Sequence, residues 1–252
     1  GTVTLNTLAG AYTLESGDAS NNKLSVTDGA SVSFSNATDN WIAGGRSMKG
    51  AASGNQVTLS GVSLNLPDAT PSSLKIAGGE TESGNADGNT VTLDTITSSG
   101  IVYGGRVGNG NNVVATVNMS VLPVSAEEST ETDTSTEADP ISTSASSNSV
   151  TITGSQVKGV YGGVGQIGSA KGNIVTITDS SVEMEAVGGE TGYMVGWITQ
   201  PGQLKDAENN QVIVNGSSTI GTVVGGEAAA ANTFDEKNGE VQTSGKSSGN
   251  TV

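Results

Sequence analysis

The only two arginines of the chain, Arg46 and Arg106, each directly follow a Gly-Gly pair. Six such positions recur, and they hold Arg46, Glu80, Arg106, Val164, Glu190 and Glu227. If the motifs stack in register, these residues form one column in which the first three charges alternate in sign. This pattern is typical of a surface charge ladder, in which each ion pair contributes at most about 1 kcal/mol. The alternative is a binding site for an anion or a sugar carboxylate around Arg46 and Arg106, because guanidinium groups recognise carboxylates.

A second group of candidate binding residues lies in the segment TGYMVGWITQPGQLKD, which contains Tyr193, Met194, Trp197 and Ile198. Aromatic residues make up only 3% of the chain, so two in one short segment are notable. Tyr and Trp are favoured at interfaces and also stack on the faces of sugars. The alternative is that the segment folds back and Trp197 covers apolar surface. We expect Trp41 to be a packing residue.

The composition excludes several kinds of chemistry. The chain has no Cys and no His, which removes disulfides, zinc sites with the usual ligands and imidazole catalysis. Glycoside hydrolysis needs two carboxylates about 5 to 9.5 Å apart. We expect no acid to recur on consecutive strand faces, and we interpret Asp94 and Asp179 as turn residues at strand ends. No calcium-loop motif is present. The sequence therefore predicts no enzyme, no metal site and no cofactor.

The net charge also bears on partners. A charge of −15 with only ten basic residues argues against binding to nucleic acid or to anionic lipid. No apolar run approaches the roughly 20 residues of a transmembrane helix, so we expect no direct membrane insertion.

The elements that must position these residues are short strands in a degenerate repeat. Copies begin with Asn, one spacer and an aliphatic residue, at Asn22, Asn55, Asn89, Asn148, Asn173, Asn210 and Asn250. Apolar residues then alternate with period two, which predicts a strand. In six copies a second apolar element follows and ends in Gly-Gly. A unit of about 25 residues without helical periodicity predicts an all-β fold, a right-handed parallel β-helix with loop insertions over residues 1–252.

The repeated Gly and Asn residues have expected structural roles. We expect the Gly-Gly pairs to lie at sharp corners with positive φ, where a Cβ would clash. We expect the Asn residues to tolerate left-handed backbone and to bond through their amides to the same position of neighbouring repeats.

Three insertions interrupt the repeat. Residues 123–147 form an acidic, Ser/Thr-rich stretch with little to bury, residues 190–209 contain the aromatic segment, and residues 227–248 form the third. Residues 111–117 keep the strand alternation but lack a following Gly-Gly, so we expect a degraded repeat there that puts unbroken stacking in doubt. Insertions in repeat folds are where binding is usually carried.

The chain is expected to be a fragment of a longer protein. Residues 1–5 have neither the charged start nor the apolar centre of a signal peptide, and residues 249–252 open another repeat.

The motif G-N-x-V-T-[IL] followed by [IV]-[YAV]-G-G, as in residues 88–93 and 102–105, resembles the repeats of passenger regions in large type V autotransporter adhesins of Gram-negative bacteria. The resemblance covers nearly the whole chain. It implies a β-helical passenger that is exported through the outer membrane by a C-terminal barrel, absent from this sequence, and displayed on the cell surface for adhesion or aggregation. It supplies no catalytic motif.

These observations leave three functions open. The first is a cell-surface adhesin segment whose loops bind a host-cell glycan, a host protein receptor or a neighbouring bacterial cell, with self-association possible. The second is a passive spacer that presents a distal binding domain. The third is a β-helical polysaccharide-degrading enzyme, which would depolymerise a glycan.

Overall fold

The structure is a computed structural model that describes residues 2–35, 39–66, 74–98, 100–108, 143–166, 168–192, 206–228, 230–235, 239–244 and 246–252. Every regular element in these ranges is a strand, so the protein is all-β as the alternating apolar pattern predicts. The same ranges contain no helix long and apolar enough to cross a membrane. Among the described strands all pairings are parallel except one hairpin.

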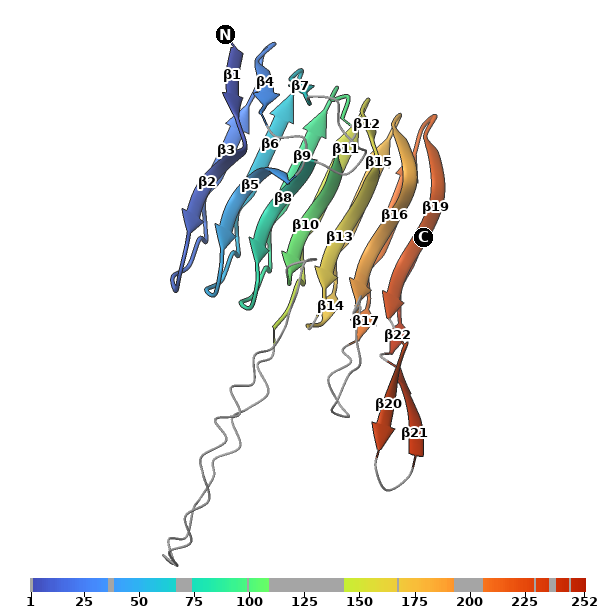
Figure 1. The fold of residues 1–252 in the computed structure, drawn as a ribbon. Coiled ribbons are helices and arrows are strands. Elements are labelled where there is room, and N and C mark those ends of the chain that lie inside the picture. The colour runs from blue at the N-terminus through green and yellow to red at the C-terminus, as the bar shows by residue number, and fades with distance from the viewer. Residues whose placement is uncertain are drawn as a thin grey trace, which may run out of the picture.

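The Gly-Gly motifs build the largest sheet, called here the glycine sheet. It contains β2 (Thr7–Thr13), β5 (Asn40–Ser47), β8 (Leu74–Thr81), β10 (Ile101–Val107), β13 (Gly159–Gly165), β16 (Ser181–Thr191), β19 (Thr219–Ala228) and the short β12 (Gln156–Val157). Apart from β12, which pairs with β16, the strands follow one another in sequence order. Figure 1 shows them side by side, from blue β2 to orange-red β19.

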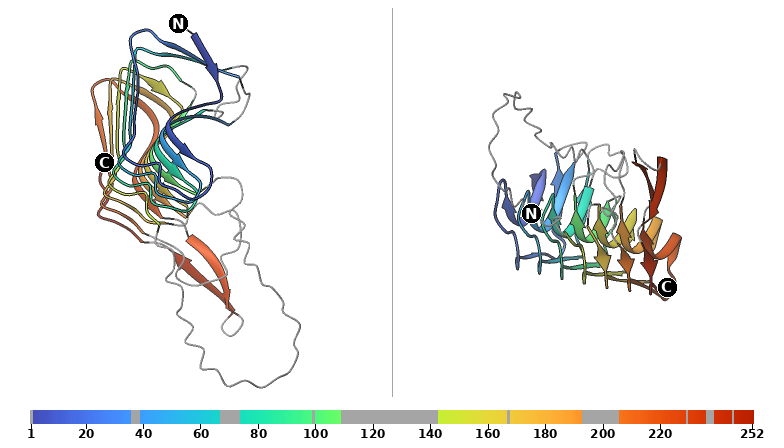
Figure 2. Two further views of the ribbon diagram at one scale, coloured as in Figure 1. Left: turned by 90° about the vertical axis from the view of Figure 1, so that its left-hand side faces the viewer. Right: turned by 90° about the horizontal axis from the view of Figure 1, so that it is seen from below.

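The strands after the first six repeated Asn residues form a second sheet, the asparagine sheet. Its members are β3 (Lys23–Val26), β6 (Gln56–Ser60), β9 (Thr90–Asp94), β11 (Ser149–Thr153), β15 (Ile174–Thr178) and β18 (Gln211–Asn215). Two smaller parallel sheets complete the repeats. They contain β1 (Thr2–Leu5), β4 (Ser31–Phe34) and β7 (Ser63–Asn65), and β14 (Ala170–Lys171), β17 (Ala207–Glu208) and β22 (Ser247–Ser248). Viewed along the row of strands, successive repeats superpose (Figure 2).

The core lies between these sheets and is built from columns of like residues. Val91 pairs with Val57 on one side and with Val150 on the other, and Leu93 pairs in the same way with Leu59 and Ile152. Aliphatic residues of the glycine sheet complete the same buried cluster, namely Ile42, Ile76, Val102 and Val160. Because side chains alternate along a strand, one face of each sheet fills the core and the other is free for polar residues.

The repeated Asn residues form a continuous amide ladder. Nδ2 of each Asn donates to Oδ1 of the next one at 2.9–3.1 Å, from Asn22 through to Asn250. The backbone N–H groups join the same acceptors, as between Asn89 and Oδ1 of Asn148 at 2.9 Å. The five central members are almost fully buried. The predicted bonding between neighbouring repeats is therefore confirmed.

The Gly-Gly pairs are not corner residues with positive φ, so that part of the expectation is wrong, whereas the expected clash of a Cβ is confirmed. They lie inside strands, and none of them has positive φ among the described residues. Their lack of a side chain serves close packing, since a Cβ on Gly79 would lie 1.9 Å from the carbonyl oxygen of Ala52 and 2.6 Å from Nδ2 of Asn89. Positive φ instead falls on the residue before each ladder Asn, for example Gly88, at 62°. The ladder Asn residues themselves are not left-handed.

The acidic insertion leaves the stack unbroken. Residues 109–142, which include the 111–117 segment and most of the predicted 123–147 loop, lie outside the described residues. Strand β9 nevertheless pairs directly with β11, and β10 pairs directly with β13. No strand therefore separates these repeats, and the expected degraded repeat between them is wrong.

The 227–248 insertion contains an antiparallel hairpin of β20 (Ala230–Asp235) and β21 (Gly239–Ser244). The hairpin extends away from the two long sheets (Figures 1 and 2). In the 190–209 insertion, residues 193–205 lie outside the described residues.

Candidate functional site

The column of residues that follow the Gly-Gly pairs is present in the structure. Parallel pairing joins Arg46 to Glu80, Glu80 to Arg106, Arg106 to Val164, Val164 to Glu190, and Glu190 to Glu227. Tyr12 of β2 precedes them beside Arg46. We call this row the charge column. It runs along the face of the glycine sheet that is turned away from the core.

The first part of the charge column is a buried ion-pair triad. Nε of Arg46 donates to Oε2 of Glu80 at 2.7 Å, and Nη1 of Arg106 donates to Oε1 at 2.8 Å. The Glu80 and Arg106 side chains are only 4% and 6% exposed, so the expected surface ladder is wrong in its exposure. Burial raises the pKa of Glu80, and both guanidinium groups oppose that shift. Since each oxygen accepts from a guanidinium, the carboxylate is held in its ionised form.

Trp41 forms the apolar support of this triad. The Arg46 guanidinium carbon lies 4.7 Å from the centre of the Trp41 ring, and Nζ of Lys75 lies 4.5 Å from it. Trp41 is 1% exposed, and its indole N–H donates to Asp39 at 2.9 Å. The expectation that Trp41 is a packing residue is confirmed, and its ring also holds cations.

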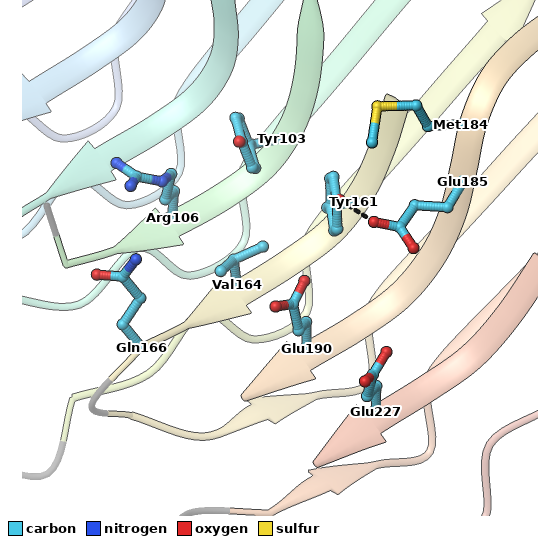
Figure 3. Close-up of a pocket in the computed structure, with 9 residues that line it drawn as sticks. All are labelled: Tyr103, Arg106, Tyr161, Val164, Gln166, Met184, Glu185, Glu190 and Glu227. Carbon is cyan, nitrogen blue, oxygen red and sulfur yellow. Dashed lines mark hydrogen bonds between the residues drawn. The ribbon is translucent and has the colours of Figure 1, made fainter. Parts of the chain in front are cut away.

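A hollow of about 460 Å³ lies next to the triad on the same face (Figure 3). It is lined by Tyr103 and Arg106 of β10, by Tyr161 and Val164 of β13 and Gln166 directly after it, by Met184, Glu185 and Glu190 of β16, and by Glu227 of β19. Four successive strands of one sheet thus contribute to one concavity. Its size is that of a small-molecule or side-chain site.

Two stacked tyrosines form one wall of the hollow. The rings of Tyr103 and Tyr161 have centroids 5.4 Å apart and an interplanar angle of 19°. The Tyr161 hydroxyl donates to Oε1 of Glu185. Burial and this bond raise the pKa of Tyr161, so its hydroxyl stays protonated and fixes the direction of Glu185.

The next two strands of the same sheet bring two carboxylates in register to the hollow. Glu190 and Glu227 are direct partners on β16 and β19, so the expectation that no acid recurs on consecutive strand faces is wrong. Burial, Glu227 and Glu185 raise the pKa of Glu190 to about 7, and Arg106 opposes the shift. Asp179 has a φ of 49° after β15 and is a turn residue as predicted, whereas Asp94 is the last residue of β9, so that the same prediction is wrong for Asp94.

The predicted site residues have different outcomes. Arg106 lines the hollow, and Arg46 lies in the triad beside it. Tyr193, Met194, Trp197 and Ile198 lie outside the described residues.

Sequence reasoning missed the tyrosine pair. Its signal was the repeated Val-Tyr-Gly-Gly at residues 102–105 and 160–163, which places a Tyr before Gly-Gly in two copies. The two copies become neighbours only because the residues between them do not separate β10 from β13.

Within the described ranges, no group of three or more acidic side chains is arranged to hold a metal ion. Comparison of the chain with protein-family models, with curated proteins and with solved structures found no match.

Proposed function

We propose that the chain forms a right-handed parallel β-helix in which each repeat is one turn. Three observations support it: the unshifted register through all six strands of the asparagine sheet, the shared aliphatic columns, and the continuous amide ladder. These are properties of a stack in which each repeat contacts mainly its neighbours.

We further propose that this β-helix is a passenger segment of a cell-surface adhesin, attached to the outer membrane through a barrel outside this sequence. Its partner would be a host-cell glycan or protein receptor, or a neighbouring bacterial cell. The observation that carries the proposal is the hollow, because stacked tyrosines and paired carboxylates from four successive strands form a concave recognition surface. A passive spacer has no use for such a surface.

The test is display of the chain on a non-adherent bacterial cell, with attachment to host cells and aggregation as readouts. We expect the double variant E190Q/E227Q to reduce attachment, and excision of residues 193–205 to do so if the aromatic insertion contributes. The matched control is E183Q, because Glu183 is an exposed acid on the same strand as Glu190. Full attachment by both E190Q/E227Q and the excision variant would contradict the adhesin proposal and favour the spacer.

A second candidate is a polysaccharide-degrading enzyme, favoured by one observation. Glu190, whose pKa is about 7, has the proton affinity of a general acid, and Glu227 is its neighbour in register. Release of reducing ends from acidic and neutral glycans, lost in E190Q, would support this function. No release from a broad glycan panel would remove it.

A further inference from the structure

The two halves of the charge column differ in how their acids are neutralised. In the first half Glu80 has an arginine on each side. In the second half Glu190 has Val164 on one side and a second acid, Glu227, on the other. Within the described residues, neither Glu190 nor Glu227 forms an ion pair. The second half of the column therefore lacks the cation that the first half contains.

The protein itself shows how this face holds a guanidinium. The Arg46 guanidinium is bonded to a carboxylate at 2.7 Å and lies 4.7 Å from the centre of an aromatic ring. Arg106 repeats the arrangement with Glu80 and Tyr103, at 2.8 Å and 5.6 Å. A carboxylate partner and an aromatic face are thus the two components of each intramolecular guanidinium site.

The hollow contains the same two components. Figure 3 shows the carboxyl group of Glu185 on β16 at the Tyr161 hydroxyl of β13, with Glu190 of β16 below them and Glu227 of β19 farther from the Tyr161 ring. Arg106 lies two strands from Glu190, roughly 10 Å along the column at the usual strand spacing of about 4.8 Å. It is already bonded to Glu80, so it does not occupy this position.

We propose that the hollow binds an alkyl guanidinium group, the chemistry of an arginine side chain presented by a partner protein. In this site Glu190 and Glu227 accept hydrogen bonds from the guanidinium, and the Tyr161 ring packs against its plane. Glu185 is held by the Tyr161 hydroxyl and adds negative potential at the edge. A guanidinium suits the site better than an ammonium because it is planar, bonds through a fork of donors and stacks on aromatic rings.

The inference concerns the purified chain and does not depend on surface display. The experiment is isothermal titration calorimetry of the full chain with Nα-acetyl-arginine amide at low ionic strength. The comparison ligands are the neutral isostere Nα-acetyl-citrulline amide, Nα-acetyl-lysine amide and glucosamine. We expect the arginine amide to bind, the lysine amide to bind more weakly, and the citrulline amide not to bind. Equal binding of citrulline, tighter binding of glucosamine, or no binding of the arginine amide would each overturn the proposal.

Variants locate the site. E190Q and E227Q, which preserve side-chain size, are each expected to weaken binding about tenfold or more, and E183Q to leave it unchanged. V164R places a guanidinium next to Glu190 in the column and is expected to abolish binding. Equal losses in E183Q and E190Q would mean diffuse attraction and overturn the site. Lys205 and Lys237 are the two cationic side chains outside the described residues. If the arginine amide binds only after both are changed to Gln, the chain fills its own hollow, and the proposal of a partner's guanidinium is overturned.

Discussion

At the scale of single residues, Glu80 is the only acidic side chain in the described part of the chain that is buried. Its two oxygens are each bonded to a different guanidinium, so its charge is compensated locally. Such a triad contributes little net stability compared with apolar packing, but it is costly to leave incomplete.

We therefore expect E80Q to lower the free energy of unfolding by about 3 kcal/mol, because Arg106 would remain buried without its carboxylate. Urea denaturation followed by circular dichroism measures the change. E227Q, in the same column but exposed, is the control and should not destabilise the chain. Equal destabilisation by both variants would show that the triad has no special role.

The raised pKa of Glu190 predicts a pH dependence of stability. Its value of about 7 in the folded chain exceeds the ordinary 4.5, because burial, Glu227 and Glu185 outweigh the attraction of Arg106. Between these two values the folded chain binds more protons than the unfolded chain, so this group's contribution to stability is full below about 4.5 and falls as the pH rises towards 7.

E190Q lacks this titration. We expect its stability relative to the natural chain to increase by up to about 3 kcal/mol between pH 4.5 and pH 8. Urea denaturation at several pH values measures this difference in unfolding free energy, in which the contributions of the other titrating groups largely cancel. A difference that does not change with pH would place the pKa of Glu190 near its usual value.

At the scale of elements, the amide ladder joins each repeat to the next. Oδ1 of Asn148 accepts both the backbone N–H and the side-chain amide of Asn89, and its own amide donates to Asn173. The terminal residue Asn22 differs, because among the described bonds its side chain only donates.

We expect N148A to destabilise the chain by about 2–4 kcal/mol, because two buried donors of Asn89 lose their acceptor. N22A should cost about 1 kcal/mol, since it removes donors at a half-buried end and leaves no buried donor unpaired. Thermal or urea unfolding compares them. Equal destabilisation by N22A and N148A would contradict the expectation that the buried bonds inside the ladder contribute more to stability than those at its end.

Sequence reasoning was most successful for elements whose signal is local. The alternation in residues 91–93 and 150–152 predicts strands, and the repeated Asn predicts the amide bonding. It failed where the cause lies in another repeat. Only glycine fits at position 79, because a Cβ there would clash with the Ala52 carbonyl and the Asn89 side chain. The explanation by positive φ does not take these contacts into account. The Tyr103–Tyr161 wall was missed because 57 residues separate its two members in the sequence, which hides their adjacency.

At the scale of the whole molecule, each repeat packs mainly on its two neighbours. The direct pairing of β9 with β11 and of β10 with β13 means that the stack is continuous without residues 109–142. Stability in such a fold is approximately a sum of repeat and interface terms.

Replacing residues 109–142 by a short Gly-Ser linker should therefore leave the strand-type circular dichroism spectrum and the unfolding midpoint nearly unchanged. The control is a deletion of residues 149–165, which removes the strands β11, β12 and β13 of one repeat together. This deletion should lower the unfolding midpoint. A large loss of stability in the linker variant would show that the 109–142 segment supports the stack.

The join between Gly108 and Thr143 has a consequence for how such a protein can change. The repeats on either side already pair directly through their own backbones. A sequence inserted between Gly108 and Thr143 therefore lies outside the paired strands and does not shift their register. Peptides of unrelated length and composition can be grafted there. Natural sequence changes at the same position can likewise alter the exposed residues without changing the paired strands.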